Sequence, residues 1–144
     1  MKINIATGDV RICQTALPAN LTLVDFLAKP AYQGSSKIIE NPPYVTYKLD
    51  ADCEGKRYVC SLYFKSGFLE WTTIYVSDRR DSTSWNDWSE TAEQQKLQSL
   101  VGVLAAQGIA NGQRFAWGSV EATYDPRAGA SSITVRYLSQ QEQR

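Results

Sequence analysis

The sequence predicts a single α+β domain, in which one antiparallel sheet of five or more strands carries a long helix on one face and a short N-terminal helix. Residues 44–78 contain three runs in which apolar and polar side chains alternate, a pattern typical of strands. Residues 89–107 carry apolar side chains at helical spacing. The 144 residues, 43% of them hydrophobic, are enough for one buried core, and no repeat or linker divides residues 1–144.

The N-terminal third predicts a hairpin, a short helix and a short strand. Residues 2–5 and 10–14 flank a Thr-Gly-Asp turn. Thr22 is suited to cap a helix, since its hydroxyl can accept from the first free amides and Asp25 lies near the positive helix end. The apolar face of this helix is expected to contain Leu23, Phe26 and Leu27, with the end at Pro30. A strand at Ile38 and Ile39 follows.

The three alternating runs predict a meander with turns at residues 54–57 and 66–67. Closing these turns places apolar side chains opposite one another on a single face. The expected pairs are Cys53 with Tyr58, Ala51 with Cys60, Leu49 with Leu62, Tyr47 with Phe64, Leu62 with Trp71, and Phe64 with Leu69. The other face is mostly polar and includes Tyr63, Glu70, Ile74 and Val76.

The C-terminal half predicts the long helix and a final hairpin. Leu97, Leu100, Val101 and Leu104 form the apolar stripe of the helix, which we expect to seal the apolar side of the meander and to end at Gly108. In the hairpin of residues 118–124 and 131–138, the buried pairs are Val120 with Val135, Ala122 with Ile133, and Tyr124 with Ser131. Phe115 and Trp117 before it fit core positions or a ligand-stacking site.

Charge and composition exclude several function classes. The 15 basic and 15 acidic residues balance, which argues against nucleic acid as a partner and against a polybasic membrane anchor. The chain has no histidine, so catalysis by Ser-His-Asp or Cys-His groups is excluded. We therefore expect no nucleic-acid or membrane partner and no cofactor.

The three cysteines, Cys13, Cys53 and Cys60, form no CxxC motif and are odd in number. This pattern matches neither a disulfide framework nor a zinc site, so we expect reduced, buried thiols in a reducing cytosol. The N-terminal residues include no apolar segment of the kind found in signal peptides. The expected location is cytoplasmic.

Asp50, Asp52 and Glu54 alternate along one strand, which points their carboxylates in the same direction. Such a row can bind a divalent cation or raise the pKa of one member. The alternative is a solvated sheet face near a turn, with Glu54 opposite Arg57.

Between the meander and the long helix lie two further features. Arg79, Arg80 and Asp81 can bind an anion or a carboxylate, or form a solvated loop. Trp85 and Trp88 lie off the buried stripe of the helix, where they would serve as interface anchors. The alternative for the tryptophans is an ordered loop that folds both indoles over the sheet edge.

Two segments support a resemblance. Residues 115–121, FAWGSVE, continued by residues 124–129, YDPRAG, and by Ser132-Ile133, resemble small uncharacterised bacterial proteins, as does Leu17–Thr22. In size and in the absence of a catalytic signature, the chain also resembles immunity proteins that neutralise polymorphic bacterial toxins. The resemblance implies a protein partner such as a toxin, and it assigns no functional residues.

We therefore expect a non-catalytic protein-binding domain, an immunity-type inhibitor or adaptor that occludes a partner protein. The abundance of aromatic residues supports recognition, with four Trp, eight Tyr and four Phe. The expected partner-binding residues are Trp85, Trp88, Arg79, Arg80 and Asp81, with Tyr63 and Glu70 as a second patch. The alternatives are a small enzyme using a carboxylate or metal site at Asp50, Asp52 and Glu54, and a subunit of a homodimer or larger homo-oligomer.

Overall fold

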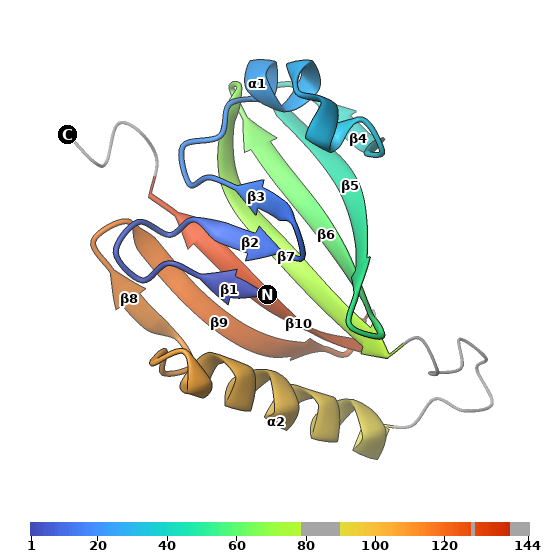
Figure 1. Ribbon diagram of the computed structural model, residues 1–144, viewed down its shortest axis with the longest axis vertical. Coiled ribbons are helices and arrows are strands. Elements are labelled where there is room, and N and C mark those ends of the chain that lie inside the picture. The colour runs from blue at the N-terminus through green and yellow to red at the C-terminus, as the bar shows by residue number, and fades with distance from the viewer. Residues whose placement is uncertain (79–89, 128, 139–144) are drawn as a thin grey trace.

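The computed structural model describes residues 1–78, 90–127 and 129–138. A seven-stranded antiparallel sheet, in the order β4-β5-β6-β7-β10-β9-β8, forms the body of the molecule (Figure 1). Its strands are β4 (Ser36–Asn41), β5 (Tyr44–Cys53), β6 (Lys56–Lys65), β7 (Phe68–Asp78), β8 (Gln113–Phe115), β9 (Gly118–Asp125) and β10 (Ala130–Tyr137). The α+β class is as predicted, whereas a second, three-stranded sheet was not expected. That sheet consists of β1 (Lys2–Ile3), β2 (Val10–Ile12) and β3 (Thr15–Leu17).

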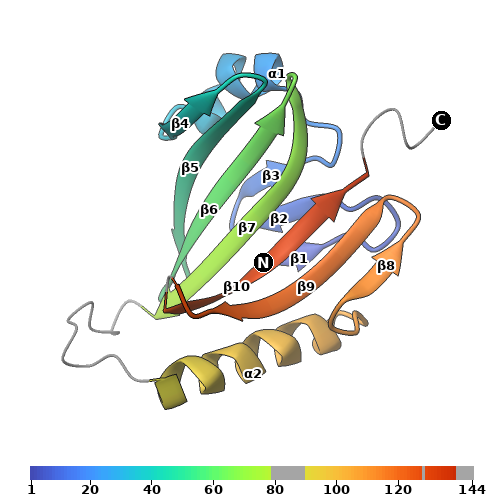
Figure 2. The ribbon, with the colours of Figure 1, turned by 180° about the vertical axis from the view of Figure 1, so that it is seen from behind.

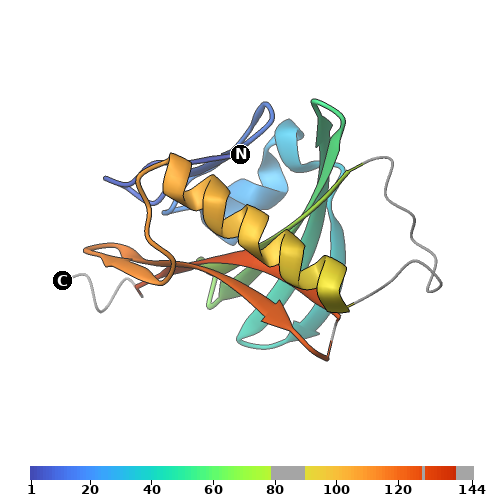
Figure 3. The same ribbon diagram turned by 90° about the horizontal axis from the view of Figure 1, so that it is seen from below.

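Two helices and the small sheet lie on the same side of the large sheet (Figure 3). Helix α1 (Leu23–Ala28) leads through a 3-10 turn, η1 (Pro30–Tyr32), into β4, and helix α2 (Glu90–Ala106) precedes β8. Helix α2 contacts β9 and β10, the hairpin that follows it in the chain. The expectation that α2 seals the apolar side of the meander holds only in part, because α2 packs mainly on β9 and β10 and α1 packs on the meander. The Phe26 ring of α1 lies 5.2 Å from that of Tyr47 and 5.4 Å from that of Phe64.

Both helices follow from their local sequence. The Thr22 hydroxyl caps α1 by accepting a hydrogen bond from the Asp25 amide at 3.1 Å. Helix α1 has only six residues and buries mainly Phe26. Leu27, which we expected on the apolar face, is 58% exposed. In α2, Leu100 and Leu104 are buried while Leu97 and Val101 are half-buried. Gly108 follows with a φ of +79°, as expected of a residue that ends a helix.

The first turn of the meander is shorter than predicted. It contains only Glu54 and Gly55, both with positive φ, so that Cys53 pairs with Lys56 and Leu49 pairs with Cys60. The predicted pairs are therefore shifted by two residues along β6. Because side chains alternate with period two, this shift leaves every side chain on its predicted face.

A β-bulge in β7 changes the faces of the third strand. Phe64 pairs with Leu69 and Tyr63 pairs with Trp71, which leaves Glu70 as an extra residue. Leu62 therefore lies opposite Thr72 instead of Trp71 as predicted. From the bulge onward the pattern is reversed: Trp71 lies on the outer face. Thr72 and Ile74 are fully buried, and Val76 packs against the core.

The C-terminal hairpin has the predicted register, with Val120 opposite Val135, Ala122 opposite Ile133 and Tyr124 opposite Ser131. The order of strands places it beside β7, through β10. Strand β8 was not predicted. Trp117 is buried and its indole nitrogen donates to the Ile5 carbonyl at 2.9 Å, which confirms the core interpretation of this residue.

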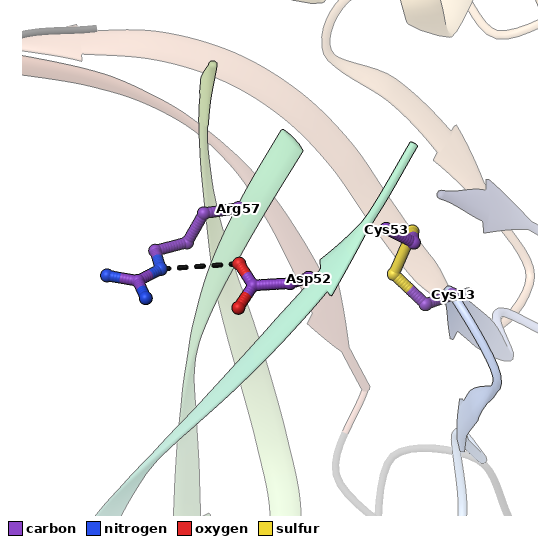
Figure 4. The surroundings of a disulfide bond; sticks show 4 residues. All are labelled: Cys13, Asp52, Cys53 and Arg57. Atoms are coloured by element: carbon purple, nitrogen blue, oxygen red, sulfur yellow. Dashed lines mark hydrogen bonds and ion pairs between the residues drawn. A yellow bond between two sulfur atoms is a disulfide. The ribbon is translucent and has the colours of Figure 1, made fainter. Parts of the chain in front are cut away.

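The cysteine expectation was wrong for two of the three residues. Cys13 and Cys53 form a disulfide, with their Cα atoms 5.8 Å apart, and Cys60 is a free, buried thiol (Figure 4). The bond joins the end of the small sheet to the end of β5. It therefore fixes the N-terminal segment to the large sheet across a sequence separation of 40 residues.

Candidate functional site: the open face of the sheet

The side of the large sheet opposite the helices and the small sheet is the open face. No helix or strand of residues 1–78, 90–127 and 129–138 lies over it (Figure 2). Its side chains come from alternate positions of the strands, beginning with Tyr44, Thr46 and Lys48 on β5. Antiparallel sheets commonly have one packed and one accessible face. An accessible face built from seven strands is a broad platform for recognition.

Three side chains form an aromatic row at the centre of the open face. The rings of Tyr63 on β6 and Trp71 on β7 stack at 4.6 Å with an angle of 20° between their planes. The Arg136 guanidinium, from β10, lies 5.2 Å from the centre of the Trp71 ring. All three are lateral neighbours, because Tyr63 pairs with Trp71 and Trp71 pairs with Arg136. A stacked pair and a cation over a ring are each favourable by about 0.5–1.5 kcal/mol, so the row is held in place before any partner binds.

Glu70 lies beside the aromatic row, at the bulge. Its Oε2 atom is buried, and no residue in the described part of the chain donates a hydrogen bond to it. A buried carboxylate oxygen without a donor is unfavourable, by about 1–3 kcal/mol in typical cases. Because this oxygen is buried, a bound molecule could reach it only if the surrounding side chains moved.

The rest of the open face is rich in hydroxyl groups. Ser61, Thr73 and Thr134 form one lateral row. In the next row, Tyr75 hydrogen-bonds to Ser132, and burial raises the pKa of the Tyr75 hydroxyl above its usual range. Thr73 and Ser132 are buried, so the hydroxyls of the partly exposed Ser61 and Thr134 are the ones in these rows that can donate to and accept from a bound polar group.

Of the predicted partner-binding residues, the structure places Tyr63 and Glu70 on or beside the aromatic row. Arg79, Arg80, Asp81, Trp85 and Trp88 lie outside the described residues. The sequence reasoning missed Trp71 and Arg136. Trp71 was assigned to the buried face because regular alternation places it there, and only the bulge turns it outward. Arg136 follows the buried Val135 and so points outward by alternation, but its contact with Trp71 depends on the pairing of β10 with β7.

The three carboxylates of the predicted metal or acid-base site do not converge. Asp52 pairs with Arg57, its cross-strand neighbour, at 3.3 Å, and Glu54 occupies the turn (Figure 4). The expected contact of Glu54 with Arg57 is therefore replaced by that of Asp52. Within the described ranges, no three side chains of His, Cys, Asp or Glu are grouped so that they could hold a metal ion.

Comparison with known proteins gives a structural match. No protein-family model matches the chain, and no curated protein matches it in sequence. The fold is similar to that of a chain in the solved structure "Rhs1-CT in complex with cognate immunity protein RhsI1", with a TM-score of 0.59 and 10% sequence identity. The match covers 99% of this chain and 92% of the other. No helix of the described residues is long and apolar enough to cross a membrane.

Proposed function

We propose that this protein is an immunity-type inhibitor, which binds a partner protein through the open face and thereby occludes the partner's working surface. The observation that carries the proposal is the match in fold, over 99% of the chain, to a chain of a complex between Rhs1-CT and its cognate immunity protein. Immunity proteins act by binding, so a site with catalytic groups is not required. The proposed contact surface is the aromatic row together with Glu70.

The chemistry of this surface supports recognition of a protein. Trp, Tyr and Arg are the residue types in which binding energy concentrates at protein interfaces. The stack of Tyr63 on Trp71 is rigid, so little conformational entropy is lost when a partner covers it. A standard interface buries about 800 Å² on each partner, an area that a seven-stranded face can supply.

Neutralisation of a toxin is the test of this function. The protein encoded immediately upstream of this chain is expressed in a bacterial host, with and without the chain. We expect its expression to stop growth and the wild-type chain to restore it. A chain with Tyr63→Ala and Trp71→Ala should no longer restore growth, whereas Val24→Ala, at a 76% exposed site on α1, should act as wild type.

These experiments test the inhibitor function and the choice of the open face as the contact surface separately. Failure of the wild-type chain to restore growth, or to bind the upstream protein in a pull-down, would contradict the inhibitor function. Restoration of growth by the Tyr63→Ala, Trp71→Ala chain would keep the inhibitor function and reject the open face as the contact surface. Circular dichroism of each variant verifies that it is folded.

The compartment is a separate proposal. Disulfides persist mainly in oxidising compartments, so the Cys13–Cys53 bond favours function outside the reducing cytosol that we first expected. An oxidising compartment and the reducing cytosol can be distinguished by mass. The protein is isolated from its native cell under alkylating conditions, and its intact mass is measured. A disulfide leaves one alkylated cysteine after unfolding, whereas a cytosolic, reduced chain carries three.

A homodimer stays a prediction. Strand β4 is an edge of the sheet, and its Ile38 and Ile39 side chains are 49% and 60% exposed. An exposed apolar edge strand can pair with a second copy. Light scattering over a range of concentrations measures whether it does.

A further inference from the structure

A pocket of about 330 Å³ lies on the covered side of the sheet, away from the open face. Its walls come from α2 between Ala92 and Val103, from the adjoining ends of β6 and β7, and from Met1. The apolar part includes Val76, Leu100 and Val103. This volume is at the lower end of the range of small-molecule sites, which are typically about 300–1,000 Å³.

The pocket forms where the lining residues of α2 change from small or polar, before Leu100, to large and apolar, at Leu100 and Val103. Leu100 and Leu104 fill the space above the sheet and are buried. The pocket-lining residues of α2 that precede Leu100 are Ala92, Gln95, Lys96 and Ser99, and none of them is buried against the sheet. The hairpin end below remains apolar at Val76. The base of the pocket is therefore apolar, and it is formed by Val76 and Leu100.

The charge of the pocket is positive. Lys56 and Lys96 are among the lining residues, and no carboxylate is found among the lining side chains that the structure describes, although Asp78 is the sheet partner of Lys56. Lys96 forms an ion pair with Oε1 of Glu93 at 4.0 Å, while Oε2 of Glu93 accepts a hydrogen bond from the Ser131 amide at 3.2 Å. Lys56 forms no ion pair with a carboxylate whose side chain the structure describes. The pocket therefore offers ammonium groups to a bound anion.

Hydroxyl groups add to this polar part. Tyr58 is 8% exposed and lines the pocket, and burial raises the pKa of its hydroxyl above the usual range, with a smaller contribution from Glu54. The hydroxyl is therefore a neutral donor near pH 7. Ser99 contributes a further hydroxyl. Donors and cations above an apolar base fit a ligand that has an anionic head and a short apolar tail.

We propose that this pocket binds a small amphipathic carboxylate, with the tail against Val76, Leu100 and Val103 and the head group at Lys56 and Lys96. The site is independent of the open face and of the proposed inhibitor function. A short-chain acyl carboxylate has the required chemistry, so octanoate is the probe. Octanamide has nearly the same shape but no charge, which makes it the matched control ligand.

Binding is measured by isothermal titration calorimetry on the full chain. We expect saturable one-to-one binding of octanoate, with octanamide weaker by about fivefold or more, since two partly exposed ammonium groups each favour the charged head. The variant Lys56→Glu should weaken octanoate binding by about fivefold or more. Lys48→Glu, on the open face, makes the same change of charge away from the pocket and should leave the affinity unchanged.

A second variant tests the position of the tail. Ser99→Phe fills the pocket from α2 and should abolish octanoate binding, whereas Ala105→Phe, at an exposed position of the same helix outside the pocket, should not. Equal affinity for octanoate and octanamide would overturn the proposal. So would an unchanged affinity in Lys56→Glu or in Ser99→Phe, or the absence of saturable binding at millimolar octanoate.

Discussion

The indole of Trp71 stacks on the ring of Tyr63, 4.6 Å away on the neighbouring strand. This contact exists because Glu70 is an extra residue in β7, which pairs Tyr63 with Trp71 where a regular hairpin would pair Leu62 with Trp71. The bulge therefore moves an indole from the core to the open face. In the proposed function, this one residue creates the centre of the recognition surface.

Deletion of Glu70 should leave the chain folded. With Glu70 removed, regular alternation from Leu69 still places Trp71 outward and Thr72 inward, so no buried side chain changes face. Deletion of Thr73 is the matched control, because it lies in a regularly paired part of β7 and would turn residues 74–78 to the wrong face. Thermal unfolding followed by circular dichroism should show a cooperative transition for the first variant and none for the second. Loss of the folded state on deletion of Glu70 would contradict this account of the bulge.

Reduction of the Cys13–Cys53 disulfide should lower the free energy of unfolding. The bond closes a loop with a sequence separation of 40 residues, for which the chain-entropy model gives about 4 kcal/mol. Urea unfolding with and without dithiothreitol measures the change. The double variant Cys13→Ser, Cys53→Ser is the control, since dithiothreitol should not affect it. Equal stability of the oxidised and reduced wild-type chain would show that the bond contributes nothing.

Substitution of Gly8 by alanine should destabilise the fold more than the same change at Gly67. The two glycines have nearly equal φ values, +84° and +85°, so the backbone cost of alanine is similar. A Cβ at Gly8 would lie 2.5 Å from Cε3 of the buried Trp117, whereas a Cβ at Gly67 meets no atom within 4 Å. We expect an additional loss of about 1–3 kcal/mol for Gly8→Ala, measured by urea unfolding. An equal loss at both positions would mean that the Trp117 ring moves away at little cost.

Stability should fall at alkaline pH, in part because of Cys60. Burial and, to a smaller extent, the charge of the nearby Asp50 raise the pKa of this thiol to about 12. In the unfolded chain the thiol ionises near pH 8.5, so above that pH the unfolded state loses a proton that the folded state keeps. Stability from this group is therefore complete below about pH 8.5 and is lost as the pH rises toward 12.

The variant Cys60→Ala isolates this effect. Between about pH 8 and pH 10, the free energy of unfolding should fall by about 2 kcal/mol more in the wild type than in the variant, while below pH 8 the two profiles should run parallel. Parallel profiles at every pH would show that the thiol titrates alike in both states.

Local patterns in the sequence predicted the strands of the meander, the capping by Thr22 and the register of the C-terminal hairpin. These features depend on neighbouring residues, and Val120 and Val135 pair as alternation requires. Residues 68–71 fit regular alternation through Trp71 as well as they fit a bulge. The bulge at Glu70 could therefore not be predicted. A tryptophan can lie on either face of the sheet. The alternation of apolar and polar residues therefore gave no sign that Glu70 is an extra residue.

The long-range contacts could not be predicted from the sequence for a different reason. The disulfide requires Cα atoms 5.8 Å apart, and nothing in the spacing of Cys13 and Cys53 encodes that distance. The pairing of Trp71 with Arg136 likewise depends on β10 lying beside β7. The open face, and with it the aromatic row, emerges only from this order of strands.

The affinity of the chain for its neutralised partner tests the central claim most directly. Isothermal titration calorimetry with the protein encoded immediately upstream should give a Kd that rises by about thirtyfold or more in Trp71→Ala, since a central interface Trp contributes about 2 kcal/mol or more. Val24→Ala should bind as the wild type does. A Trp71→Ala chain that is folded and keeps the wild-type Kd would contradict the claim that the open face binds the partner.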